Sequence, residues 1–376
     1  MKIFFTITFI ILFKFFTIRL AVNARDNSIS NEIDMGSTTP INQIANFYLN
    51  GTNPVELGKV NWLRNFDEAV KRAKKLNKTI LVLFQEVPGC STSSGYGREV
   101  LSHPLIVDAI QSLFVPVAIY NNHGGDDYKT LRSFGEPSWN NPVVRIITPE
   151  RNELAPRLSG DYSQLKLVNR ILRALKESNE TAPPYLELLA QELRAKSSNI
   201  EEATFAMHCF WEGEAKLGNI EGVISTKPGF MNGHEVVEIL YDPEVTSYAE
   251  LLSKANAEKV ANHVFVKDNK QKDVVEKITA GSSISEKSTF RADDDPKHYL
   301  AHTFLKYVPM TQLQSARVNA AIAQGKSPEQ LLSPSQLQLL EFIKKHPDLN
   351  WPNVVDSSDY VTAWNSSMTI VSNYYK

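Results

Sequence analysis

The stretch Phe205-Ala-Met-His-Cys209-Phe-Trp-Glu-Gly-Glu214 places one of the two cysteines of the chain directly before two aromatic residues. A rare thiol beside a bulky apolar pair is typical of a nucleophile with a small hydrophobic pocket. If Cys209 starts a helix, the helix dipole and the free N–H groups favour its thiolate. A buried, unreactive cysteine in an aromatic core is the alternative, and this stretch alone does not decide between the two.

Further motifs follow in a fixed order, and together they are more specific than any one of them. They are Gly222-Val-Ile-Ser-Thr226, Gly229-Phe-Met-Asn-Gly233, and His234-Glu235 followed by a Val-Val strand that ends in Tyr-Asp-Pro243. The succession resembles the A-type peptide-methionine sulfoxide reductases. That family carries Gly-Cys-Phe-Trp-Gly, then Gly-Val-x-Ser-Thr, then Glu-Val-Val. Its pattern can be laid on residues 209–233 without a gap.

The resemblance implies a role for each residue of the motif. Cys209 matches the cysteine that attacks the sulfur of methionine S-sulfoxide in proteins or peptides. Phe210 and Trp211 match the aromatic slot for the S-methyl group, and Glu235 matches the catalytic acid. Since a dry aromatic pocket raises the pKa of a carboxyl, Glu235 is expected to hold the proton that it donates.

A second pair of substrate-binding residues is implied further along the chain. Asp294 and Tyr299 match the Asp-x-x-x-x-Tyr spacing of the family, with the tyrosine donating to the sulfoxide oxygen. Residues 293–295 are three consecutive aspartates, so the register is open. A solvated acidic turn before a helix is the alternative.

The chain also departs from the family. His208 and Glu212 replace the glycines that flank the Cys-Phe-Trp motif, and no cysteine follows Cys209 to resolve it. The segment between the Gly-Gly turn and the acid is missing, and with it a second tyrosine that holds the sulfoxide oxygen. His208 or His234 could replace that donor, although each is equally explained as an ordinary hydrogen-bonded histidine.

The N-terminal half alternates predicted strands and helices, which indicates an α/β layer fold. A helix is expected after an Asn65 cap, and strands are expected at Thr79–Phe84, Phe114–Ile119 and Pro142–Ile147. Val87-Pro-Gly-Cys90-Ser-Thr-Ser93 lies where thioredoxin-like domains carry their redox motif, and the region resembles them. Ser93 replaces the second cysteine, and Asn141-Pro142 matches the position of their cis-proline.

Cys90 is the only other thiol in the chain. A sulfenic acid on Cys209 would condense with a nearby thiol, so Cys90 is a candidate resolving cysteine, with an external thioredoxin-type dithiol as the reductant. A buried or vestigial Cys90 is one alternative, and a permanent disulfide between the two cysteines is another.

Composition limits the remaining classes. Hydrophobic content of 42%, charge of 22% and a net charge of −2 over 376 residues are those of a globular protein without a nucleic-acid surface. No zinc-type Cys/His spacing or phosphate loop is present, so no metal or bound cofactor is expected. Residues 1–24 match a signal peptide, which predicts a secreted or periplasmic protein unless this segment stays as an anchor.

The expected organisation is a signal peptide (1–24), a polar lead-in (25–55), a thioredoxin-like domain (56–178), a linker and helix (179–200), a ferredoxin-like α/β reductase domain (201–345) and a C-terminal tail (346–376). The expected function is repair of oxidised proteins by methionine sulfoxide reduction under oxidative stress, with oxidised proteins and a thiol-disulfide reductase as partners. A thiol-disulfide or redox-sensing protein with a degenerate reductase domain is one alternative. A non-enzymatic envelope protein that binds methionine peptides is the other.

Overall fold

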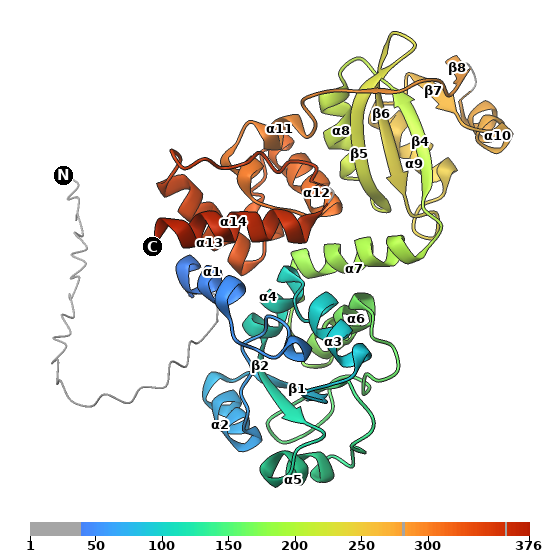
Figure 1. The fold of residues 1–376 in the computed structure, drawn as a ribbon. Coiled ribbons are helices and arrows are strands. Elements are labelled where there is room, and N and C mark those ends of the chain that lie inside the picture. The colour runs from blue at the N-terminus through green and yellow to red at the C-terminus, as the bar shows by residue number, and fades with distance from the viewer. Residues whose placement is uncertain (1–38, 280–282, 358) are drawn as a thin grey trace, which may run out of the picture. The chain divides into compact units, whose positions relative to one another are not determined.

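The computed structural model describes residues 39–279, 283–357 and 359–376. The predicted signal peptide and residues 25–38 of the predicted lead-in lie outside these residues. Within the described part, the chain forms two separate β-sheets with helices around them (Figure 1). No helix there is both long enough and apolar enough to cross a membrane.

The first sheet has the order β2-β1-β3, with β1 (Thr79–Gln85) parallel to β2 (Phe114–Tyr120) and antiparallel to β3 (Val143–Ile147). All three strands were predicted from their apolar runs, and β1 is buried from its second residue onward. Helix α2 (Phe66–Leu76) begins at Asn65 as predicted, since the Asn65 side chain accepts a hydrogen bond from the Glu68 N–H. Further helices of this region are α3 (Ser91–Glu99), α4 (Pro104–Leu113), α5 (Gly125–Ser133) and α6 (Gln164–Glu177).

The second sheet has the order β8-β7-β4-β6-β5-β9. Its centre is built from the unit β4 (Glu201–Ala206), α8 (Phe210–Gly218), β5 (Val223–Met231), β6 (His234–Tyr241), α9 (Tyr248–Ala257) and β7 (His263–Val266). The strand order β7-β4-β6-β5, all antiparallel, is that of a ferredoxin-like fold. The prediction of a ferredoxin-like α/β domain is therefore confirmed. The sheet is extended by β8 (Ser283–Glu286) and β9 (Arg291–Ala292), and α10 (Asn269–Ile278) joins β7 to β8.

A tight hairpin joins β5 to β6. Met231 pairs directly with His234, so the turn is only Asn232 and Gly233. Both turn residues have positive φ, 48° and 80°, as a type I′ turn requires, and Asn-Gly is its preferred sequence. This turn lies where the reductase family is expected to carry its tyrosine segment. Because the turn is so short, Glu235 is the second residue of β6.

The prediction of a loose lead-in and an unstructured C-terminal tail is wrong in part, because both segments contain packed helices. Residues 41–50 form α1 (Ile41–Asn50), and residues 360–374 form α14 (Tyr360–Tyr374). The Tyr48 and Trp364 rings meet edge to face at 6.1 Å. Apolar residues at helical spacing drive this packing, and the polar residues between them concealed the pattern in the sequence.

The predicted boundary at residue 345 is also not a boundary of the hydrophobic core. The C-terminal helices α13 (Pro334–Lys345) and α14 share one apolar cluster with α1 and the thioredoxin-like region. At the start of α13, the buried Asp108 carboxylate of α4 accepts hydrogen bonds from the Ser333 and Ser335 hydroxyls and from the Ser335 N–H. The remaining helical elements are α7 (Pro184–Ser197), α11 (His298–Ala301) and α12 (Gln312–Ala323), with 3-10 turns at Val55–Leu57, Phe304–Tyr307 and Glu329–Leu331.

Candidate functional site

Cys209 lies at the N-terminus of α8. It is the N-cap residue, its backbone is extended at φ −131°, and its carbonyl accepts the first helical bond from the Gly213 N–H at 3.0 Å. The thiol is partly buried and free. The prediction that Cys209 begins a helix is confirmed, and α8 therefore directs its unpaired N–H groups toward this residue.

Glu235 is tied to the same turn by two hydrogen bonds. Its carboxylate Oε2 accepts from the Phe210 N–H at 2.9 Å, and its backbone carbonyl accepts from the Met207 N–H at 3.1 Å. The predicted acid and the predicted nucleophile thus come together at one helix terminus. Within the described residues, the other carboxylate oxygen, Oε1, accepts no hydrogen bond.

Aromatic rings cluster beside the thiol. The Phe210 ring is 5.7 Å from the Trp211 ring and 5.2 Å from the Phe230 ring, centroid to centroid. Phe210 is buried, whereas Trp211 and Phe230 are only partly buried and border the apolar core of the domain. The close approach of Met207 depends on Gly213, because a Cβ there would lie 1.8 Å from the Met207 sulfur. The predicted methyl slot thus corresponds to three neighbouring rings, two of which are partly exposed.

The acidic run contributes a different aspartate from the predicted one. The Trp211 Nε1–H donates to Asp293 Oδ2 at 3.4 Å, and the same oxygen accepts from the Asp295 N–H at 3.1 Å. Asp294 is exposed, so Asp293 is the aspartate that orients the indole. Three consecutive aspartates offered no sequence signal to choose among them.

Tyr299 lies within electrostatic reach of the thiol. Burial raises the pKa of Tyr299, and the nearby Cys209 and Glu212 charges raise it further. The phenol therefore stays protonated at neutral pH and can donate a hydrogen bond toward an oxygen held at Cys209. The two histidines that were suggested as replacement hydrogen-bond donors have different surroundings. His208 is exposed, and His234 stacks on His263 at 4.9 Å.

Sequence analysis missed a buried ion pair that holds α11 against α8. The Lys297 Nζ lies 2.9 Å from Glu214 Oε1, and the Lys297 N–H donates to Glu214 Oε2 at 2.7 Å. Both side chains are at most 1% exposed. A second carboxylate, Asp356 of the C-terminal segment, also lies beside this lysine, with its Oδ1 3.0 Å from the Lys297 Nζ. The Glu214 and Asp356 charges outweigh burial and raise the pKa of Lys297, so the ammonium keeps its charge.

Cys90 occupies the matching position in the thioredoxin-like region. It is the N-cap of α3, is exposed, and is also a free thiol. Hydrogen bonds from the Ser93 backbone and hydroxyl lower the pKa of Cys90. The Ser93 hydroxyl also lies 2.6 Å from the Asn141 side-chain oxygen, which competes with the Cys90 sulfur, 3.7 Å away, for its one proton. The Asn141–Pro142 bond is cis, as is Val87–Pro88. Cys90 and Cys209 are both free thiols in this structure.

Comparison with known proteins defines the class of each region. Residues 61–149 match the family described as thioredoxin-like, and residues 201–255 match the family described as peptide methionine sulfoxide reductase. The chain thus combines a thioredoxin-like region with a mixed α/β domain of the methionine sulfoxide reductase type. Both resemblances inferred from sequence are confirmed.

Similar proteins match a short stretch of this chain. A peptide methionine sulfoxide reductase MsrA 1 from a Nostoc species is 39% identical over 71 residues, which cover 14% of this chain and 44% of that protein. The MsrA of Methanothermobacter thermautotrophicus is 38% identical over 72 residues, covering 15% of this chain and 43% of that protein. The chain thus spans under half the length of these relatives. A solved structure titled DsbH oxidoreductase covers 34% of this chain and 92% of its own at a TM-score of 0.27 and 19% identity.

Proposed function

We propose that this protein reduces methionine S-sulfoxide in proteins or peptides, with Cys209 as the nucleophile. The observation that carries the proposal is the hydrogen bond from the Phe210 N–H to the Glu235 carboxylate, which holds this acid at the helix N-terminus that Cys209 caps. A free thiol at a helix N-terminus, a carboxyl with one unengaged oxygen and a partly open aromatic pocket are the three groups that sulfoxide reduction needs.

In the proposed reaction, the Cys209 thiolate attacks the sulfoxide sulfur, and Glu235 protonates the oxygen. The oxygen passes to the cysteine, so that methionine is released and Cys209 becomes a sulfenic acid. The Tyr299 phenol donates a hydrogen bond to the oxygen during the transfer, and Phe210 and Trp211 hold the S-methyl group. Because the two-residue hairpin leaves no second tyrosine, the reaction is expected to be slower than one with two donors.

We further propose that Cys90 resolves the sulfenic acid. Condensation of the two cysteines would release water and form a disulfide, which an external dithiol would reduce to two thiols. The exposure and lowered pKa of Cys90 support a thiol of this kind. The same two observations also favour a second candidate function, thiol-disulfide exchange at Cys90 with no sulfoxide reduction.

The test is turnover of a methionine S-sulfoxide peptide in excess dithiothreitol by the mature chain. Cys209→Ala is expected to abolish turnover, and Glu235→Gln to lower it by ~10²–10⁴-fold. Glu244→Gln is the control because Glu244 is exposed. Cys90→Ala is expected to complete a first turnover as the unaltered chain does. It should fail in later turnovers when the reductant is weak. No turnover by the unaltered chain would rule out the reductase, and tight peptide binding without turnover would then favour the methionine-peptide binding protein.

Export is a separate proposal, supported by the charged start, apolar stretch and Ala-Val-Asn-Ala24 of the first residues. It predicts a mature N-terminus at Arg25. N-terminal sequencing of the protein from its native source tests this. An uncleaved chain in the cell interior would contradict export.

A further inference from the structure

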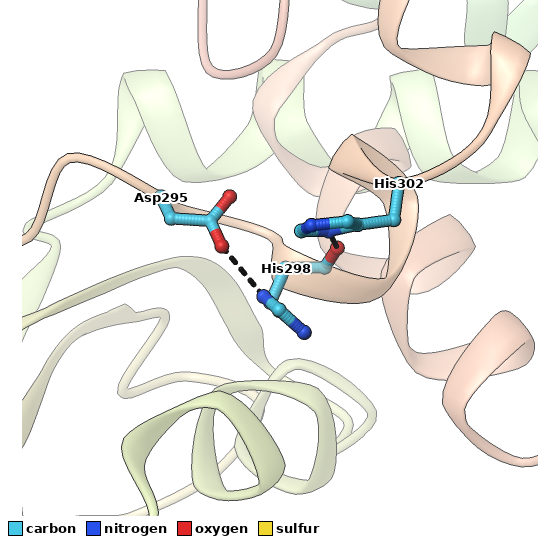
Figure 2. Close-up of side chains that lie close together, drawn as sticks. All are labelled: Asp295, His298 and His302. Atoms are coloured by element: carbon cyan, nitrogen blue, oxygen red, sulfur yellow. Dashed lines mark hydrogen bonds and ion pairs between the residues drawn. The ribbon is translucent and has the colours of Figure 1, made fainter.

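We propose that Asp295, His298 and His302 form a binding site for a divalent transition-metal ion, with Zn²⁺ as the probe. The sequence predicts no metal site, since its cysteines and histidines form no complete zinc motif. In the structure, each of the three side chains offers one ligand atom, and these atoms all lie within 4.8 Å of one another. Figure 2 shows the Asp295 carboxylate and the two imidazole rings turned toward one common space.

The spacing of the residues explains why they meet. His298 is the first residue of α11 and His302 is its C-cap, four residues later, so the two side chains lie on one face, one helical turn apart. Their ring centroids are 4.3 Å apart. Asp295 lies three residues before His298, and its Oδ2 is 2.6 Å from the His298 Nδ1. The ligand set is two imidazoles and one carboxylate, which suits Zn²⁺ and Cu²⁺ and leaves a coordination position for water.

The hydrogen bonds of the two rings prepare them to bind a cation. His302 Nδ1 lies 2.7 Å from the His298 carbonyl oxygen, and a carbonyl can only accept, so Nδ1 carries the proton. With Nδ1 as the donor, the neutral form of the ring would present the lone pair of Nε2 to the metal. This is the arrangement in which an outer partner fixes the tautomer of a metal ligand. At His298, the ion would take the place of the proton shared with Asp295.

The position of the central ligand is fixed before any ion binds. The His298 ring stacks on Trp211 at 4.0 Å with an interplanar angle of 11°. The preceding residue, Lys297, is locked by its ion pair with Glu214, so α11 has little freedom to turn. A preset ligand loses less entropy on binding than a mobile surface histidine does. His302, by contrast, is exposed, which gives the ion access from solvent.

The test measures binding itself and does not depend on reductase activity. Zn²⁺ is titrated into the full chain carrying Cys90→Ser and Cys209→Ser, so that thiolates cannot bind it, in competition with a chromophoric chelator. One ion per chain with micromolar affinity is expected. His302→Ala and Asp295→Asn are each expected to weaken binding at least ~10-fold. His346→Ala, which removes a histidine elsewhere, should leave the affinity unchanged.

Either of two results of the Zn²⁺ titration would overturn the proposal. One is the absence of saturable binding at micromolar Zn²⁺ by the parent chain. The other is equal affinity in the parent and in His302→Ala. Because His302 is exposed, loss of folding is not expected to complicate this variant, and circular dichroism checks it. An electron paramagnetic resonance spectrum of the Cu²⁺ complex should show two nitrogen ligands, and one or none would equally contradict the assignment.

Discussion

The two cysteines differ in surroundings although both are N-cap residues of helices. Cys209 is partly buried, directly precedes the aromatic residues Phe210 and Trp211, and caps the helix whose Phe210 N–H donates to the Glu235 carboxylate. Cys90 is exposed and bonded by Ser93, the residue that replaces the second redox cysteine. A serine thus stands where thioredoxin-like motifs carry the second cysteine, and its backbone N–H and hydroxyl favour the thiolate of Cys90.

The first prediction concerns the thiolate of Cys90. Since the Ser93 hydrogen bonds lower its pKa, the midpoint of its alkylation rate against pH should lie below the ordinary thiol value of about 8.5. Ser93→Ala removes the hydroxyl bond and should move the midpoint upward. The measurement is the rate of iodoacetamide modification in a Cys209→Ser background. An unchanged midpoint in Ser93→Ala would show that the hydroxyl has no such role.

At the scale of elements, the β5–β6 hairpin determines where Glu235 lies relative to Cys209. The Asn232-Gly233 turn brings Glu235 to the start of β6 without an intervening loop. Gly233 has φ +80°, a conformation that costs a residue with a Cβ ~1–2 kcal/mol. Gly233→Ala is therefore expected to lower the thermal midpoint.

The control is Gly95→Ala. Gly95 lies inside α3, and a Cβ there would meet nothing within 4 Å. Alanine should stabilise that helix by ~0.5–1 kcal/mol. Opposite shifts of the two thermal midpoints, measured by circular dichroism, are the predicted result. A neutral Gly233→Ala would mean that the turn relaxes into another type.

The second element-level prediction concerns the buried pair that joins α11 to α8. Lys297→Met leaves the Glu214 carboxylate buried without its partner, which should cost ~3–5 kcal/mol. Adding Glu214→Leu to Lys297→Met should restore part of the lost free energy of unfolding, because the methionine and leucine side chains would then pack against each other. The exposed pair Lys216–Glu212 supplies the control, and Lys216→Met should cost only ~0.3–0.5 kcal/mol. Urea unfolding measures all three, and equal effects of the two lysine substitutions would contradict this role.

At the scale of the whole molecule, helices from both ends of the described chain complete one core. Trp364 of α14 is 1% exposed and lies against Tyr48 of α1. Trp364→Ala is expected to cost ~3–5 kcal/mol by leaving a cavity. Trp139, which is 80% exposed, is the control, and its change to Ala should stay within ~0.5 kcal/mol. Thermal unfolding compares them. A small effect at Trp364 would show that α14 is not part of the core.

Much of this architecture could be predicted from local sequence signals. The apolar runs predicted β1, β2 and β3, and the linked motifs after Cys209 predicted the ferredoxin-like unit and the meeting of Cys209 with Glu235. Such features depend on residues close in sequence, or on motifs whose order is distinctive.

Long-range pairings could not be predicted in the same way. The Lys297–Glu214 pair joins residues 83 positions apart, and nothing in either local stretch marks the other. The packing of α14 on α1 joins opposite ends of the described chain through apolar residues dispersed among polar ones. The choice of Asp293 over Asp294 depends on where the Trp211 indole lies, which only the folded chain defines.

The measurement that tests the central claim most directly is a single turnover. The reduced chain, with Cys90→Ser to prevent resolution, is mixed with one equivalent of a methionine S-sulfoxide peptide and a sulfenic-acid trap. The account predicts one reduced peptide and one trapped adduct per chain, located at Cys209 by peptide mass mapping. An unmodified methionine peptide should give no adduct. A reduced peptide without an adduct at Cys209, or an adduct at another residue, would contradict the assignment of Cys209 as the nucleophile.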